Sequence, residues 1–302
     1  MYPSLSVIIV SDYEDSVESK SWSNERSILS AIANQDYSGQ FDVLLVENKA
    51  FEQSVPAELF PDNLDVKTVF CEKNHSPELK NYGVSVAQSE LVAILEADCI
   101  PNPEWLRLLV ESLTKHPEMD CASGRTLYGT KDSYQRCLSL LDRGFDDLGA
   151  SGNTPFLCIN GAVYRRSVFE KVSFPAEANP FLAGHLFTVR LRRQGCRFFF
   201  EKDAYTVHQI GGFDFLIDFR RNSGAAIFAA INTIYGKTHW LKIAWQRASQ
   251  ELSTCSRLGK KYLYWQDWLW LPGLFLAARF FEIQGLLAAH RGETEIPGSA
   301  YR

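Results

Sequence analysis

The sequence predicts an α/β protein with a doubly wound, mostly parallel sheet and a helical C-terminal extension. Apolar runs of strand length alternate with helical patterns over residues 5–115, and this alternation is typical of a parallel sheet whose strands are connected by helices. From residue 213 onward the pattern is helical, over residues 213–235, 240–252 and 261–290. We therefore expect two domains, an α/β domain over residues 1–210 and a helical extension over residues 211–302.

Four strands are expected in the first part of the α/β domain. Residues 5–10, 41–46, 66–70 and 91–95 form short apolar runs, as expected of parallel strands that are buried on both faces. The segments between them, residues 21–34, 77–87 and 103–115, are expected to be helices. The third helix begins with Pro103, and proline is favourable at a helix start because its missing N–H donor is not needed there.

The second part of this domain is less regular. Residues 120–124 and 159–166 are expected to be strands, residues 182–194 a helix that ends at Gly195, and residues 197–200 and 205–207 two short strands. Glycine commonly follows the last turn of a helix because it adopts the left-handed conformation without strain. Residues 125–158 show no clear pattern.

Composition excludes several classes of protein. The 302 residues are 46% hydrophobic, which suffices for a substantial core, and the net charge of −5 does not favour nucleic-acid binding. The seven cysteines are scattered and no C-x-x-C pair occurs, so we expect reduced thiols in a cytosolic protein and neither a zinc site nor a disulfide framework. The N-terminus lacks the basic and apolar segments of a signal peptide.

Two carboxylates follow the apolar run over residues 91–95. Glu96 and Asp98 are one residue apart, at the place where the fourth expected strand ends. Ligands of open parallel sheets bind just beyond the carboxyl ends of the strands, and carboxylate oxygens suit Mg²⁺ or Mn²⁺ carrying a phosphorylated substrate. The alternative is that both acids cap the helix near Pro103. Their distance from that helix start favours the ligand role.

The order of these segments resembles the family 2 glycosyltransferases of the GT-A fold over roughly residues 4–210. Residues 6–13 look like the first strand and the nucleotide-contacting loop of that family, and residues 41–47 like its second strand. Four shorter segments resemble other family elements: Gln35-Asp-Tyr37, Leu79-Lys-Asn-Tyr-Gly83, Glu96-Ala-Asp98 in place of D-x-D, and Asn160-Gly-Ala-Val-Tyr-Arg-Arg166 on the acceptor side.

This resemblance implies inverting, metal-assisted transfer of a sugar from a nucleotide-sugar to a hydroxyl acceptor. Mg²⁺ or Mn²⁺ would be held by Glu96, Asp98 and His208. The donor, with a UDP-sugar favoured over GDP- or dTDP-sugars, would contact Ser11, Asp12, Tyr13, Glu47, Lys80, Glu96, Asn160 and Gly161. Lys80 has the equal alternative of facing water, and His208 that of a structural histidine at a strand end. The acceptor would be a glycan or a lipid-linked sugar, in polysaccharide or cell-envelope synthesis.

The sequence departs from the family where the catalytic base is expected. Glu47 and Glu96 stand where the family has aspartate, and no carboxylate precedes Arg190, where the family carries its general base. Ala183 and Gly184 occupy that position and His185 follows. Imidazole has a suitable ordinary pKa for this role, so His185 is one candidate base and Glu177 another. The alternative is a binding or scaffold protein that kept the fold and lost the activity.

A nucleotidyltransferase would also use paired carboxylates at a sheet edge. Such an enzyme usually has a glycine-rich, basic loop after the first strand, whereas residues 11–16 here are acidic and lack glycine. This class is therefore disfavoured.

Tryptophans and basic residues alternate in the C-terminal extension. Residues 209–264 carry eight basic and three acidic side chains, and five tryptophans occur at positions 240, 245, 265, 268 and 270. Indole and cationic groups together suit a membrane interface. We expect a cytoplasmic protein with a peripheral position at the inner face of the membrane through its C-terminal helices. The alternative is that the aromatic residues pack the helices onto the α/β domain or onto a second subunit.

Overall fold

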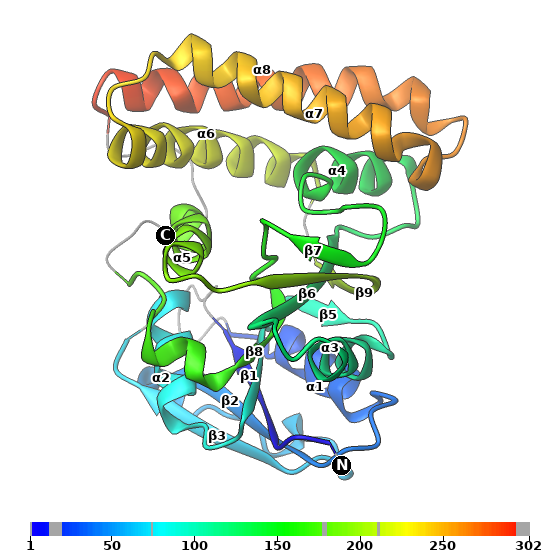
Figure 1. The fold of residues 1–302 in the computed structure, drawn as a ribbon, viewed down its shortest axis with the longest axis vertical. Helices are drawn as coiled ribbons and strands as arrows, with labels where there is room; N and C mark the ends of the chain where they lie inside the picture. Colours follow the sequence, from blue (N-terminus) through cyan, green and yellow to red (C-terminus); the bar gives the residue numbers. More distant parts are fainter. Residues whose placement is uncertain (1, 12–19, 74, 177–179, 210–211, 294–302) are drawn as a thin grey trace. The chain divides into compact units, whose positions relative to one another are not determined.

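The computed structural model describes residues 2–11, 20–73, 75–176, 180–209 and 212–293. The chain divides into two compact units. Unit 1 comprises Met1–Thr126 and Asp146–His208, and unit 2 comprises Leu127–Phe145 and Gln209–Arg302 (Figure 1). The division into domains at residue 210 stays a prediction. In the structure, unit 2 also includes the segment 127–145, whose sequence shows no clear pattern.

The parallel half of the sheet in unit 1 lies where the apolar runs predicted it. Strands β1 (Leu5–Val10), β2 (Phe41–Asn48), β3 (Val66–Cys71) and β4 (Leu91–Glu96) lie in the order β3-β2-β1-β4 and run parallel. Alternate residues of β1 enter two separate hydrophobic cores. One core includes side chains of α1 (Ser23–Ala33) and α3 (Trp105–Lys115), and the other includes those of α2 (Ser76–Val86) and α5 (Pro180–Arg193). Burial on both faces explains why β1, β4 and the middle of β2 are apolar. Strand β3 lies at the edge of the sheet and is only partly buried, so the expectation that it is buried on both faces is wrong.

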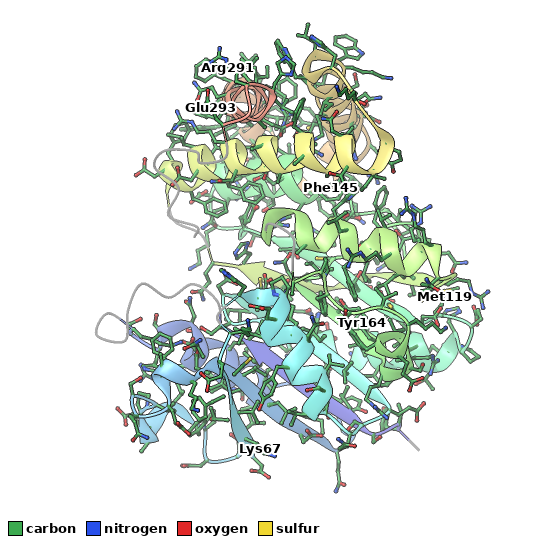
Figure 2. All side chains as sticks on the ribbon, turned by 90° about the vertical axis from the view of Figure 1, so that its left-hand side faces the viewer. Lys67, Met119, Phe145, Tyr164, Arg291 and Glu293 are labelled. Atoms are coloured by element: carbon green, nitrogen blue, oxygen red, sulfur yellow. The ribbon has the colours of Figure 1, made fainter. Side chains whose placement is uncertain are left out.

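The other half of the sheet is antiparallel. Strand β8 (Gly161–Arg165) pairs with β4, and the order continues through β6 (Cys121–Leu127) and β9 (Phe198–His208) to β5 (Cys99–Pro101), with β7 (Gly152–Thr154) beside β9. Figure 2 shows Tyr164 of β8 inside this unit, where it is fully buried, whereas Lys67 of β3 points outward and is exposed. The expected mixed α/β fold with C-terminal helices is confirmed.

Two expectations about local structure are corrected. The short strands expected at residues 197–200 and 205–207 are one strand, β9, whose polar middle is only partly buried because different partners hold its ends. Residues 125–158 contain helix α4 (Ser133–Arg143), whose start is capped by Asp132, since its side chain accepts from the Gln135 N–H at 2.8 Å. Short 3₁₀ turns lie at Lys49–Phe51, Ala57–Leu59 and Arg166–Glu170.

Unit 2 is a bundle of α4 with α6 (Phe213–Tyr235), α7 (Trp240–Tyr262) and α8 (Asp267–His290) (Figure 1). Helices α6 and α8 approach so closely that glycine is needed on both. A Cβ atom on Gly224 would lie 2.2 Å from the Glu282 carbonyl oxygen, and one on Gly285 would lie 1.9 Å from the Arg221 carbonyl oxygen. This helix crossing therefore depends on backbone-to-backbone packing.

Buried charges connect all four helices of unit 2. Arg220 of α6 is 1% exposed and forms ion pairs with Asp142 of α4, Glu251 of α7 and Glu282 of α8. Arg279 of α8 joins the same cluster through Glu251 and Glu282. Burial tends to raise the pKa of Glu282, but the surrounding arginines overcome it and lower that pKa to about 2. The cluster therefore holds Glu282 ionised inside the bundle, whereas burial raises the pKa of Asp142 and of Glu251 despite the same arginines.

Candidate functional site

Glu96 and Asp98 both lie buried at the carboxyl end of β4. They are 5% and 6% exposed. Glu96 is the last residue of β4 and is paired in register with Val10, the last residue of β1. The two acids thus lie at the edge of the sheet at which β1 also ends, as the strand pattern predicted.

The Glu96 carboxylate has three polar neighbours. Lys80 of α2 donates to its Oε1 atom at 2.6 Å and Ser76 to the same atom at 3.3 Å, while the Asn160 amide donates to Oε2. Burial tends to raise the pKa of Glu96, but the Lys80 ammonium overcomes it and holds that pKa below its usual range. The Lys80 side chain is 2% exposed, so the alternative that it faces water is wrong.

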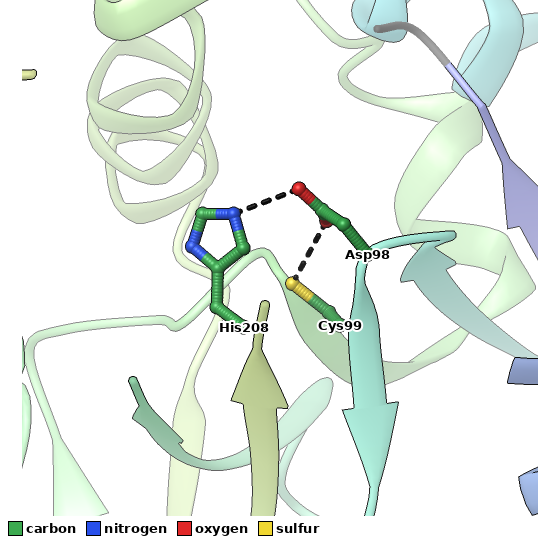
Figure 3. Close-up of side chains that lie close together, drawn as sticks. All are labelled: Asp98, Cys99 and His208. Carbon is green, nitrogen blue, oxygen red and sulfur yellow. Dashed lines mark hydrogen bonds and ion pairs between the residues drawn. The ribbon is translucent and has the colours of Figure 1, made fainter. Parts of the chain in front are cut away.

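Asp98 pairs with a histidine that is distant in the sequence. Strands β5 and β9 pair so that Cys99 is opposite His208, and this register brings His208 Nε2 to 2.8 Å from Asp98 Oδ2 (Figure 3). The Cys99 thiol donates to Asp98 Oδ1 at 3.3 Å. The ligand atoms of these three residues lie within 4.8 Å of one another.

These side chains fit a divalent cation. Carboxylate oxygen and imidazole nitrogen are suitable ligands for Mn²⁺, and sulfur is softer than this ion prefers. Asp98 and His208 are therefore the residues that would hold Mn²⁺ or Mg²⁺, with Cys99 at the side. The Glu96 carboxylate is already engaged by Lys80 and Asn160, so a direct metal contact from Glu96 stays a prediction.

A second buried cluster lies where β1 and β2 end. Glu47 is fully buried, and its Oε2 atom is 2.5 Å from Lys20 Nζ. Lys20 also lies 3.2 Å from Glu25 Oε1, to which the Ser11 hydroxyl donates at 2.5 Å. Burial raises the pKa of Glu47 to about 7, although Lys20 and the Asn48 N–H both act to lower it.

The sequence pattern did not predict that Lys20 and Glu25 belong to this cluster. The one feature that could have indicated Lys20 is that it is the only basic residue in the segment 11–20, which contains four acids. The predicted nucleoside contacts of Ser11 and Glu47 stay predictions. Asp12 and Tyr13, predicted for the same role, lie outside the described residues.

The family-like segments also position this sheet edge. The Gln35 amide donates to the Asn102 carbonyl and accepts from the Leu106 N–H, both at 2.9 Å, which ties the end of α1 to the segment after β5. Asn81 makes two hydrogen bonds with the backbone of Phe174, at 2.8 and 2.9 Å. A Cβ atom on Gly83 would lie 2.5 Å from Ile8 Cγ2, so α2, and with it Lys80, can lie close to β1.

The predicted acceptor side is near α5. Asn160 and Gly161 stand at the start of β8, and Gly161 packs so closely on Thr206 that a Cβ atom would lie 2.6 Å from its Cγ2. Gly184 of α5 is equally close to Ile159, with 2.4 Å from a Cβ atom to Ile159 Cδ1. His185 is exposed on this helix, so its catalytic role stays a prediction. Glu177, the other candidate base, lies outside the described residues.

Solved structures with similar folds include a mannosyltransferase and a protein in complex with a nucleotide-sugar. The mannosyltransferase PcManGT from Pyrobaculum calidifontis, in complex with GDP-Man and Mn²⁺, is 17% identical with a TM-score of 0.59, and 95% of this chain and 86% of that chain are covered. S. aureus TarS 1–349, in complex with UDP-GlcNAc, is 15% identical with a TM-score of 0.50, with 96% and 92% covered. At these identities the likeness shows the fold alone, and that fold is GT-A-like.

The sequence comparison identifies the family. The model of glycosyl transferase family 2 matches residues 23–173, which include β2, β4, Glu96, Asp98 and Asn160. This match covers half of the chain, and the protein belongs to glycosyl transferase family 2. A search of curated protein sequences gives no match. The predicted family is thereby confirmed.

Proposed function

We propose that this family 2 glycosyltransferase transfers a sugar from a nucleotide-sugar to a hydroxyl acceptor with inversion and with the help of Mg²⁺ or Mn²⁺. The observation that carries the proposal is the pairing of Asp98 with His208 at 2.8 Å beside Glu96, at the carboxyl end of the sheet. A cation at Asp98 and His208 would neutralise the charge that develops on the leaving diphosphate.

The chain's own residues would prepare this edge for the donor. Lys80 and Asn160 hold the Glu96 carboxylate in one position, so that β4 presents a fixed acidic edge to the diphosphate side of the donor. The cluster of Ser11, Glu47 and Lys20 lies where the nucleoside is expected, at the ends of β1 and β2. A UDP-sugar is the favoured donor, and GDP- and dTDP-sugars are the alternatives.

His185 is the proposed base, because helix α5 offers no carboxylate. Over Pro180–Arg193 the helix contains neither aspartate nor glutamate. The side chain of His185 is exposed, so an acceptor hydroxyl can reach it, and imidazole takes a proton near neutral pH. The same lack of acid supports a second candidate function, a protein that binds the donor without transferring the sugar.

The acceptor and the location are proposed from the family resemblance and from the composition. A glycan or lipid-linked acceptor in polysaccharide or cell-envelope synthesis is proposed from the family resemblance. A cytoplasmic location is proposed because seven cysteines in a chain of this size suit a reducing compartment.

Thermal unfolding with UDP-, GDP- and dTDP-sugars, each with and without Mn²⁺, tests this proposal. We expect one nucleotide class to stabilise the protein, with Mn²⁺ required and with Asp98→Asn abolishing the effect. The matched control is Asp65→Asn, an exposed aspartate of unit 1. Release of the nucleoside diphosphate, lost in His185→Ala, supports transfer. Binding without turnover would favour the second candidate, and binding of no nucleotide-sugar would refute both.

A further inference from the structure

The outward side of helix α8 carries no charge. Its carboxylate and guanidinium side chains, Asp267, Arg279 and Glu282, are 0%, 8% and 1% exposed, respectively, and the exposed His290 stands at its last residue. Arg136 of α4 holds Asp267 through two hydrogen bonds of 2.8 Å, and the buried cluster of unit 2 holds Arg279 and Glu282. The outer face of a helix in water is usually polar. The arrangement in α8 therefore indicates an environment other than water.

The residues that α8 exposes are apolar and aligned. Leu269, Leu276 and Phe280 are 75%, 67% and 58% exposed. They are spaced by seven and four residues, so they lie on one side of the helix. Ile283 and Leu287, both partly buried, continue the same line. The stripe therefore runs along most of the length of α8.

Helix α7 adds a second apolar stripe beside the first. Leu241, Trp245 and Leu252 are 55%, 73% and 55% exposed and share one helix side with Gly259 by their spacing. A Cβ atom on Gly259 would lie 2.7 Å from the Trp268 ring of α8, so this side of α7 borders α8. The two stripes lie on helices that pack together, and we call them jointly the α7–α8 surface.

Aromatic and cationic groups gather where the two helices meet. Trp265 and Trp270 are 78% and 58% exposed, and Lys260 and Lys261 at the end of α7 are also exposed. Indole rings favour the headgroup region of a bilayer, and lysines beside it are attracted by anionic lipid. A second copy of this chain is a less suitable partner than anionic lipid. The acidic side chains of its own α8 are buried, so that helix would offer no negative charge to Lys260 and Lys261.

We propose that the α7–α8 surface binds the surface of an anionic lipid bilayer, with α8 in the plane of the interface. Leu276, Phe280 and the tryptophans would enter the headgroup region, and the lysines would contact lipid phosphates. Among the described residues, α8 is the one helix whose length and composition would allow it to cross a membrane. Its opposite side packs on α4, α6 and α7 and contains the buried charges, so only one side faces lipid. This proposal is independent of the transferase activity.

Vesicle flotation of the full chain tests the proposal. We expect binding to phosphatidylcholine vesicles that contain about 30% phosphatidylglycerol, a blue shift of tryptophan emission, and weaker binding in about 0.5 M NaCl. Leu276→Glu with Phe280→Glu should lower partitioning by about tenfold for each charge placed in the interface. The control Gln246→Glu with Gln250→Glu adds the same charge at exposed positions of α7 off the stripe and should keep most of the binding.

Three outcomes would overturn the proposal. The first is no flotation with anionic vesicles at low salt, and the second is equal flotation of the Leu276/Phe280 variant and the control. The third is a dimer, measured by light scattering without lipid, that the Leu276/Phe280 variant converts to monomer. If that variant fails to fold, Lys260→Gln with Lys261→Gln replaces it, with an expected loss of about fivefold per lysine on anionic vesicles. Nucleotide binding, measured in parallel, reports on the proposed transferase site separately.

Discussion

Glu47 makes the stability of unit 1 depend on pH in a direction that a surface glutamate would not. The carboxyl is fully buried, and burial raises its pKa from 4.5 to about 7 despite its contact with Lys20. Between these pH values the unfolded chain has lost the proton and the folded chain retains it. Rising pH therefore stabilises the unfolded state, and the free energy of unfolding falls.

The size of this effect follows from the two pKa values. One pKa unit corresponds to about 1.4 kcal/mol, so the contribution of Glu47 is complete below pH 4.5 and is reduced by about 3 kcal/mol once the pH passes 7. Glu47→Gln removes the titrating group. The variant also loses the contact between Glu47 and Lys20, which offsets its stability. The stability difference between variant and wild type should therefore shift by about 2.5 kcal/mol in favour of the variant between pH 5 and pH 8.

Calorimetric unfolding at several pH values between 5 and 8 measures this difference. For a unit of this size we expect the melting temperature of Glu47→Gln to rise by roughly 5–10 °C relative to wild type between pH 5 and pH 8. Glu58→Gln, at an exposed position of the same unit, is the matched control and should follow wild type. If the melting temperature of Glu47→Gln instead falls relative to wild type as the pH rises, the Glu47 carboxylate is ionised in the folded protein. Its pairing with Lys20 then outweighs the effect of burial.

Three further predictions concern the carboxylate edge and the bundle. His208→Ala and Asp98→Asn should each remove at least about tenfold of the Mn²⁺-dependent donor affinity while leaving the melting temperature without ligand within a few degrees, as measured by titration calorimetry. Lys80→Met should destabilise unit 1 by about 3–5 kcal/mol in urea unfolding, because it leaves Glu96 buried without its cation, whereas Lys67→Met should be nearly neutral. Gly285→Ala should lower the melting temperature of unit 2, because its Cβ atom would meet the Arg221 carbonyl oxygen; an unchanged melting temperature would mean that α6 and α8 separate without cost.

The sequence predicts the parts of the fold that local pattern determines. The strands β1 and β4 and the middle of β2 are apolar because both of their faces are covered, whereas β3 at the edge of the sheet is only partly buried; each of the four lies within a few residues of its predicted limits. Glu96 and Asp98 could be placed at the sheet edge for the same reason. Helix α4 was not predicted because polar residues interrupt its apolar pattern. Its apolar side is buried by contacts with α7 and α8, which are distant in the sequence.

The partners of the site residues could not be predicted, because pairing across the sheet determines them. Asp98 meets His208 through the register of β5 and β9, across 110 positions of the chain. Lys20 reaches Glu47 from a loop whose composition predicts only acidity. The position of Lys80 on a helix could be predicted, but its partner could not. Lys80 contacts Glu96 because Gly83 allows α2 to pack closely on β1.

The buried charges of helix α8 have two consequences: they stabilise the bundle, and they leave the outer side of the helix apolar. Arg279 and Glu282 interrupt an apolar sequence, which argues against a membrane span when the sequence is taken alone. In the bundle both side chains turn toward Arg220 and Glu251, where each charge finds an opposite one. Because these charges pair inside the bundle, the outer side of α8 exposes apolar side chains up to its last residue, His290. A variant that breaks the cluster, such as Glu251→Gln, should therefore weaken the bundle and vesicle binding together, whereas Leu276→Glu should weaken vesicle binding alone.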